Sequence, residues 1–268
     1  MKKMQFSERS FRLFASVTGN GSRKIIAFHG FGQDNSVFRI FHKITDHSYQ
    51  LHSFDLPFHG KSSMPIRKGG LDKDQFRDFF LDYFQSTAIS SFTLIGFSIG
   101  AKFALNLVHF FPERIDRLIL IAPDGLKINF WYHMATNTWF SRHVFRYFMQ
   151  HPVIFMKFAD MLTVTRLIHP SVSRFAKSQM EDDRIRQLIY DSWVNYRTLN
   201  LDIRDMGKVI DRHRIPVEIF LGEKDRVISA DAVKPLIREF HHVKVHMLPV
   251  GHTRLIEDTA EFYEREGF

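Results

Sequence analysis

The sequence predicts an α/β fold, in which a doubly wound and mostly parallel β-sheet carries a helical insertion. Three features of the 268-residue chain lead to this prediction. Short, nearly continuous apolar segments are typical of strands that are covered on both faces. Amphipathic helical segments alternate with these strands, which favours right-handed β-α-β connections. A long segment without strands then interrupts the alternation.

The predicted elements follow one another in the order that such a sheet requires. Strands are predicted at Phe11–Val17, Lys24–Phe28, Gln50–Asp55, Phe92–Gly96, Arg117–Ala122, Val217–Gly222 and Val243–Leu248. Helices are predicted at Ser36–Thr45, Asp72–Thr87, Ile99–Phe111, Ala230–Phe240 and His252–Glu264. Side chains share a face about every two residues in a strand and about every 3.6 residues in a helix, which separates the two classes.

One segment, residues 124–202, breaks the alternation. It is helical in pattern, aromatic and basic, and it holds all three tryptophans of the chain. In open α/β sheets ligands bind outside the carboxyl ends of the strands, so an insertion there is expected to form a lid. The predicted domains are therefore a core of residues 1–123 and 203–268 and a helical lid (cap) of residues 124–202.

Composition excludes several classes of protein. A hydrophobic content of 44% and a charged content of 25% are ordinary for globular domains. The lysines near the N-terminus precede no apolar signal-peptide core, and no apolar run approaches the ~20 residues of a membrane-spanning helix. The absence of cysteine excludes disulfides, thiolate metal sites and a cysteine nucleophile. We therefore expect a cytoplasmic enzyme.

The formal net charge of +8 raises the question of nucleic-acid binding. The basic residues are scattered along the chain, and neither a zinc-finger spacing nor another recognition motif accompanies them. We expect no nucleic-acid partner. A cationic surface that attracts anionic substrates explains the charge, and peripheral contact with a membrane is the weaker alternative.

A candidate nucleophile lies where a predicted strand meets a predicted helix. The pentapeptide Gly96-Phe97-Ser98-Ile99-Gly100 matches G-x-S-x-G in this strand-turn-helix context. Such a turn strains the backbone of the serine, and a side chain at either glycine would collide with the neighbouring strand or helix. The competing interpretation is an ordinary turn serine that caps the helix.

An acid and a histidine follow Ser98 in the order that this kind of turn requires. Asp225 comes after the strand at Val217–Gly222, and His252 comes after the strand at Val243–Leu248. His252 would accept the hydroxyl proton, and Asp225 would orient the imidazole. Asp124 also ends a strand and is a rival for the acid. We favour Asp225 and leave the role of Asp124 open.

Attack on a carbonyl also requires donors for the oxyanion that develops. The backbone N–H of Ile99, at the start of its helix, is one candidate, since the helix dipole there favours negative charge. The backbone N–H of Phe31 is the other, because it lies in the loop His29-Gly30-Phe31-Gly32 that follows a predicted strand.

Five motifs together resemble the α/β-hydrolase superfamily, in particular its lid-bearing serine hydrolases. They are HGFGQ at 29–33, DLPFHGKSS at 55–63, GFSIG at 96–100, GEKD ending at residue 225 and GH at 251–252. The resemblance implies the α/β-hydrolase fold with Ser98, Asp225 and His252 as its catalytic triad. Phe58 replaces the first glycine of the family pattern DLPGHGxS, which puts the shape of that loop in doubt.

The predicted function is hydrolysis of a carboxylic ester or a related acyl substrate through an acyl-serine intermediate. No metal is expected, since His242 and His246 would share a face only on a helix and their segment is partly strand. No cofactor is expected either, and Asp55 stands where a phosphate loop ending in Gly60-Lys61-Ser62 would need its first glycine.

Two further functions stay open at this point. One is a C–C bond hydrolase or lyase that acts on an acidic oxo-substrate with the same triad, and the other is a ligand-binding receptor with little turnover. In each case the partner is a small molecule. The sequence does not distinguish a monomer from a homodimer.

Overall fold

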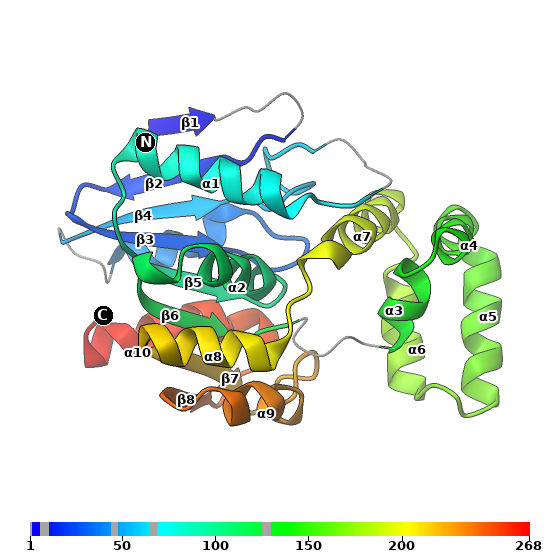
Figure 1. The fold of residues 1–268 in the computed structure, drawn as a ribbon. Coiled ribbons are helices and arrows are strands. Elements are labelled where there is room, and N and C mark those ends of the chain that lie inside the picture. Colours follow the sequence, from blue (N-terminus) through cyan, green and yellow to red (C-terminus); the bar gives the residue numbers. More distant parts are fainter. Residues whose placement is uncertain (1, 6–10, 44–47, 65–68, 125–129) are drawn as a thin grey trace. The chain divides into compact units, whose positions relative to one another are not determined.

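The computed structural model describes residues 2–5, 11–43, 48–64, 69–124 and 130–268, and these build one β-sheet with helices on both faces (Figure 1). The eight strands are β1 (Lys2–Gln5), β2 (Phe14–Gly19), β3 (Arg23–Phe28), β4 (Tyr49–Phe54), β5 (Phe92–Phe97), β6 (Ile115–Ile121), β7 (Val217–Gly222) and β8 (Val243–Leu248). Their order in the sheet is β1-β2-β4-β3-β5-β6-β7-β8. The β1–β2 and β2–β4 pairs are antiparallel and the others are parallel. The predicted doubly wound, mostly parallel sheet is confirmed.

Helices cover the sheet on both faces because successive strand residues point to opposite sides. The helices of this part of the chain are α1 (Lys73–Thr87), α2 (Gly100–Phe110), α8 (Ile203–His213), α9 (Ala230–Glu239) and α10 (Leu255–Glu266), with short 3-10 helices η1 (Asn35–Lys43), η2 (Pro112–Arg114), η3 (Arg197–Leu199) and η4 (His252–Arg254). The ring of Phe28 packs against Phe80 of α1 and Phe103 of α2. The preceding residue, Ala27, belongs to the core cluster on the other face, together with side chains from η1 and α10.

Three elements differ from the sequence-based expectation. Strand β1 was not predicted, and neither was helix α8. The expected helix at Ser36–Thr45 is the 3-10 helix η1, and the expected end of that helix at Thr45 lies outside the described residues. The remaining strands and helices of the sheet lie within a few residues of the predicted bounds.

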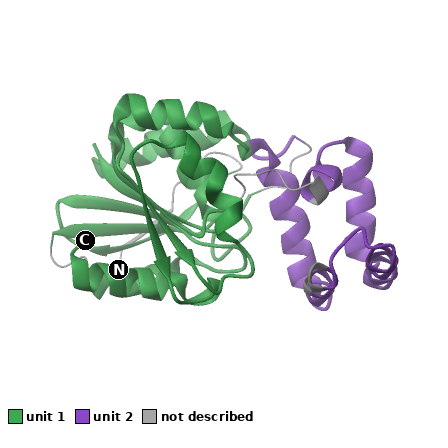
Figure 2. Ribbon diagram, turned by 90° about the horizontal axis from the view of Figure 1, so that it is seen from below, with its two compact units in different colours: residues 1–65, 72–127, 199–268 green, residues 66–71, 128–198 purple. Residues whose placement is uncertain are grey.

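The chain divides into two compact units, which Figure 2 colours separately. Unit 1 consists of Met1–Pro65, Asp72–Lys127 and Leu199–Phe268, and unit 2 of Ile66–Leu71 and Ile128–Thr198. The helices of unit 2 are α3 (Phe130–Thr136), α4 (Trp139–Gln150), α5 (Pro152–Val164), α6 (Pro170–Ser178) and α7 (Asp183–Tyr196). Most of unit 2 falls within residues 124–202, and the interpretation of that segment as a lid stays a prediction.

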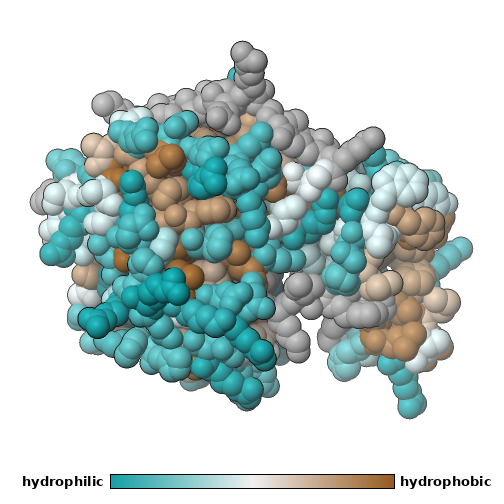
Figure 3. Space-filling model, viewed as in Figure 1, coloured by the Kyte–Doolittle hydropathy of each residue, from teal (hydrophilic) through white to brown (hydrophobic). Residues whose placement is uncertain are grey.

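Unit 2 has its own aromatic core and a partly apolar surface. The ring of Phe145 on α4 lies 5.5 Å from the rings of both Tyr190 and Trp193 on α7. Figure 3 shows further hydrophobic residues on the outside of the helices of this unit. Across the described ranges, the structure contains no helix with the length and apolar character needed to cross a membrane.

Candidate active site

Ser98 follows β5 in a sharp turn that leads into α2. Its backbone has a φ of +50°, in the left-handed region that a serine rarely occupies. The turn is fixed from both sides, because Ser98 N donates to Ile121 O (2.9 Å) and Ser98 O accepts from the amides of Ala101 (3.0 Å) and Asp124 (3.1 Å). A conformation of this kind costs about 1–3 kcal/mol and clusters at functional sites.

The two glycines beside Ser98 allow close approach of the backbone. A Cβ atom on Gly96 would lie 2.8 Å from Ala101 Cα, and one on Gly100 would lie 2.3 Å from Phe28 O and 2.6 Å from His29 O. Gly96 therefore lets α2 pack closely on β5, and Gly100 lets α2 begin directly against the end of β3. The sequence analysis expected a side chain at either glycine to collide with its neighbours, and these short distances agree with that expectation.

Asp225 and His252 come together at the carboxyl edge of the sheet. Asp225 lies after β7 and His252 after β8, two neighbouring parallel strands, so their ends meet at the same edge as the end of β5. His252 Nδ1 lies 2.7 Å from Asp225 Oδ2. The other carboxylate oxygen, Oδ1, accepts from the amides of Val227 (2.7 Å) and Ile228 (2.9 Å).

These contacts lower the pKa of Asp225. Burial by itself would raise the pKa of Asp225, but the hydrogen bonds from His252 and from the amides of Ile228 and Val227 bring its pKa below the ordinary value. An ionised carboxylate only accepts, so Nδ1 of His252 carries the proton that is donated to Asp225. The lone pair of a neutral imidazole is then on Nε2.

The imidazole of His252 packs on the residue next to Ser98. The rings of Phe97 and His252 have centroids 5.0 Å apart. Within the described residues, the Ser98 hydroxyl makes no hydrogen bond to His252.

The loop after β3 lies against the residue that precedes Ser98. A Cβ on Gly30 would lie 2.9 Å from the ring of Phe97, which puts the loop against the Ser98 turn. The Gly30 amide donates to Gln33 Oε1 (3.0 Å) and thereby closes the loop. In the loops and turns of the described ranges, the amides of Phe31 and Ile99 donate to no backbone acceptor.

Two buried polar side chains support this loop. His29 Nδ1 donates to Gly30 O (2.7 Å), and His29 Nε2 accepts from Leu56 N (2.9 Å). Burial lowers the pKa of His29 to about 3, so the ring is neutral and can act as donor and acceptor at once. Asp55 Oδ1 accepts from Asn35 N (2.7 Å), and Asp55 Oδ2 accepts from Lys61 N (2.7 Å). The Asp55 carboxylate thus holds two loops together through hydrogen bonds to their main-chain amides.

Lys102, one helical turn after Ser98, is a buried residue that the sequence-based prediction missed. Its Nζ donates to Asn200 Oδ1 (3.1 Å). Burial lowers the pKa of Lys102 to about 8, and the nearby Asp124 carboxylate partly opposes this shift. The signal in the sequence was a lysine within the apolar helix pattern IGAKFALNL. Asp124 thus lies beside Lys102, whereas Asp225 is the carboxylate that bonds His252.

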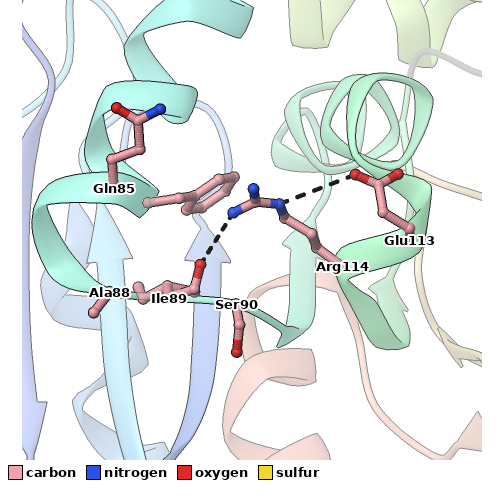
Figure 4. A pocket seen from close by; sticks show the side chains of 7 residues that line it. Gln85, Ala88, Ile89, Ser90, Glu113 and Arg114 are labelled. Atoms are coloured by element: carbon pink, nitrogen blue, oxygen red, sulfur yellow. Dashed lines mark hydrogen bonds and ion pairs between the residues drawn. The ribbon is translucent and has the colours of Figure 1, made fainter.

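A separate pocket of about 490 Å³ lies at the opposite end of β5 from Ser98 (Figure 4). In it Arg114 donates to Ile89 O (3.1 Å) and is 4.0 Å from Glu113. The pocket holds none of the predicted site residues. In the described ranges, no three or more His, Asp or Glu side chains are arranged to hold a metal ion.

Comparisons with known proteins agree with this fold. The chain is 27% identical over 231 residues to the dihydrolipoyllysine-residue acetyltransferase component of the acetoin cleaving system of Pseudomonas putida, covering 85% of this chain and 59% of that protein. It is 23% identical over 271 residues to Lipase 3 of a Moraxella species, covering 98% of this chain and 80% of the lipase. The chain thus spans less than two thirds of the first of these relatives.

A solved structure has the same fold. A thermophilic esterase from Thermogutta terrifontis superimposes with a TM-score of 0.69 at 14% identity, covering 99% of this chain and 97% of the esterase. The sequence pattern of the alpha/beta hydrolase fold matches residues 24–259, nearly the whole chain. The protein is therefore a member of the alpha/beta hydrolase family.

Proposed function

We propose that the protein hydrolyses a carboxylic ester or a related acyl substrate through an acyl-serine intermediate. The observation that carries this proposal is the hydrogen-bonded Asp225–His252 pair at the same sheet edge as the strained Ser98 turn. Membership of the alpha/beta hydrolase family and similarity to a lipase and an esterase support hydrolysis.

In the proposed reaction, Ser98 Oγ attacks the carbonyl carbon and gives its proton to His252 Nε2. The C–O bond to the leaving alcohol then breaks, and the alcohol leaves with that proton. Water, deprotonated by His252, attacks the acyl-serine and releases the acid. Asp225 stabilises the imidazolium that forms twice in this cycle, and it holds the ring in the required orientation.

The backbone N–H groups of Phe31 and Ile99 are the proposed oxyanion donors. The amide of Ile99 directly follows the nucleophile and precedes α2, where the helix dipole favours negative charge. The amide of Phe31 lies in the loop held by His29 and Gln33. Removal of one such donor typically reduces kcat by about 10²–10³-fold.

Replacement of Ser98 tests the proposal directly. Ser98→Ala is expected to abolish turnover of short p-nitrophenyl esters and covalent labelling by a fluorophosphonate probe, because no other group in this scheme forms the acyl bond. Ser90→Ala, an exposed serine before β5, is the matched control and should keep both. Labelling of the Ser98→Ala protein at the wild-type rate would contradict the nucleophile assignment.

The same panel separates the alternative functions. Long-chain esters, thioesters and anionic diketo acids should be assayed beside the short esters with wild-type protein and Ser98→Ala. Turnover confined to diketo acids would favour C–C bond cleavage. Turnover at background for every substrate, with a ligand-dependent rise in Tm, would favour a receptor.

A further inference from the structure

Helix α5 of unit 2 exposes a stripe of apolar side chains. At about 100° per residue, its residues Val153, Ile154, Lys157, Met161 and Val164 fall on one side of the helix. Val153 is 59% exposed and Val164 is 82% exposed. The opposite side packs into unit 2, where Ala159 and Leu162 are buried. The stripe is therefore a second apolar face on a helix whose first face already forms the core.

Aromatic side chains add to this surface from the neighbouring helix α4. Trp139 and Phe140 at its start are 64% and 70% exposed, and Tyr147 is 47% exposed. The buried side of α4 is formed by Phe145 and Met149, so these three are not needed for its packing. Large apolar side chains exposed in such number on two consecutive helices are typical of interaction sites.

The segment that carries the stripe has a positive net charge, and the acidic residues 181–183 follow directly after it. Residues 128–180 contain six lysines and arginines and one carboxylate, Asp160. That carboxylate is paired with Lys177. Lys157 lies within the α5 stripe, and Arg166 comes between its last residue and the exposed Leu167. In the part of the chain that the structure describes, Lys157 and Arg166 form no ion pair.

We infer that the exposed faces of α4 and α5 dock on the surface of an anionic lipid bilayer. The argument is complementarity in both charge and chemistry. Apolar side chains interleaved with unpaired cations suit the boundary between acyl chains and anionic headgroups. Exposed Trp and Tyr are the side chains that concentrate at that boundary. The inference does not depend on the proposed ester hydrolysis, because it concerns binding alone.

Co-sedimentation of the full chain with vesicles tests the inference. Wild-type protein should bind vesicles of equal parts phosphatidylcholine and phosphatidylglycerol more tightly than pure phosphatidylcholine, and raised salt should weaken this binding. The triple variant Val153→Ser, Met161→Ser, Val164→Ser should lose at least about tenfold in affinity, since it removes apolar area from the interface. The matched control, Val227→Ser with Met247→Ser, changes two exposed apolar residues of unit 1 and should bind like wild type.

A second variant tests the inference independently of whether the triple variant folds. Lys157→Glu changes one surface charge and should weaken binding to the phosphatidylglycerol vesicles without changing binding to pure phosphatidylcholine. Failure of wild-type protein to bind phosphatidylglycerol vesicles at low salt would overturn the inference. A wild-type dimer that the α5 triple variant converts to monomer, without lipid, would assign the surface to self-association and would equally overturn it.

Discussion

The main chain at Phe58 has a φ of +68°, in the left-handed region where the family pattern has glycine. The loop therefore keeps a conformation suited to glycine although its residue is phenylalanine. Two residues later, Gly60 has a φ of +54°, and a Cβ there would lie 2.2 Å from Asp55 Oδ2. The departure from the family pattern thus leaves the left-handed backbone in place and adds strain at one residue.

The strain at Phe58 predicts an unusual order of stability among its variants. Alanine at an ordinary position is more stable than glycine by roughly 0.5–1 kcal/mol. At a φ of +68° the order should reverse, so that Phe58→Gly has a higher free energy of unfolding than Phe58→Ala by about 1 kcal/mol. Urea denaturation of the two variants measures this difference. The ordinary order, with alanine more stable, would contradict a left-handed Phe58.

Lys102 should make stability depend on alkaline pH. Its pKa is about 8 in the folded chain, against an ordinary lysine value of 10.5 once the chain unfolds. Between these values the unfolded chain holds more protons than the folded chain, so the free energy of unfolding rises with pH. Relative to Lys102→Met, the wild type should gain up to about 1.4 kcal/mol per pH unit from pH 8 towards pH 10.

Denaturant titrations of wild type and Lys102→Met across this pH range check the prediction. Because each measurement is a difference between the two proteins at one pH, titrations elsewhere in the chain cancel to first order. A difference that stays constant from pH 8 to pH 10 would show that Lys102 titrates normally in the folded protein.

At the scale of elements, the sequence predicted the central strands well and two other elements poorly. The parallel strands are apolar on both faces, and this pattern is visible in the residues themselves. Strand β1, with the sequence KKMQ, carries no such pattern and forms by pairing with β2 at the sheet edge. Helix α8 does carry a signal, since Asp202 caps its first amides and Met206 and Ile210 are buried on one side. It was missed because it begins where the insertion was expected to end.

The parallel strands also explain how much of the candidate site was predictable. Ser98, Asp225 and His252 each follow a strand, and the ends of parallel strands lie at one edge, so chain order alone predicts their neighbourhood. The sequence favoured Asp225 over Asp124 as the partner of His252 although both aspartates follow a strand, and in the structure His252 bonds Asp225. Lys102 was missed because its partner in the structure, Asn200, lies almost a hundred residues further along the chain.

At the scale of the whole molecule, unit 2 contains a segment that chain order could not assign to it. Residues 66–71 precede α1 and are separated from the rest of unit 2 by more than fifty residues. The amide of Leu71 donates to Asn195 O (2.9 Å), and Leu71 O accepts from Thr198 Oγ1 (2.6 Å). These contacts lie at the end of α7. This segment, with the sequence IRKGGL, has no periodic pattern and gives no indication of such a distant partner.

The net charge of the whole chain leads to the last prediction, which rests on the proposed ester hydrolysis. With 37 lysines and arginines against 29 acidic residues, the molecule carries a formal charge of +8. A field of this sign accelerates the encounter with anionic substrates and leaves neutral ones unaffected. The kcat/KM for an ester with an anionic acyl chain should therefore fall severalfold from low salt to the ionic strength at which the Debye length is about 8 Å.

An uncharged ester of the same length is the matched substrate, and its kcat/KM should change little over the same salt series. The ratio of the two values is the quantity to follow, because salt effects on the catalytic groups themselves divide out. A ratio that does not change with salt would mean that the positive charge is spread too evenly to guide substrates to Ser98. The positive charge would then contribute to binding at a different surface. The structure indicates the α5 stripe with Lys157 as that surface.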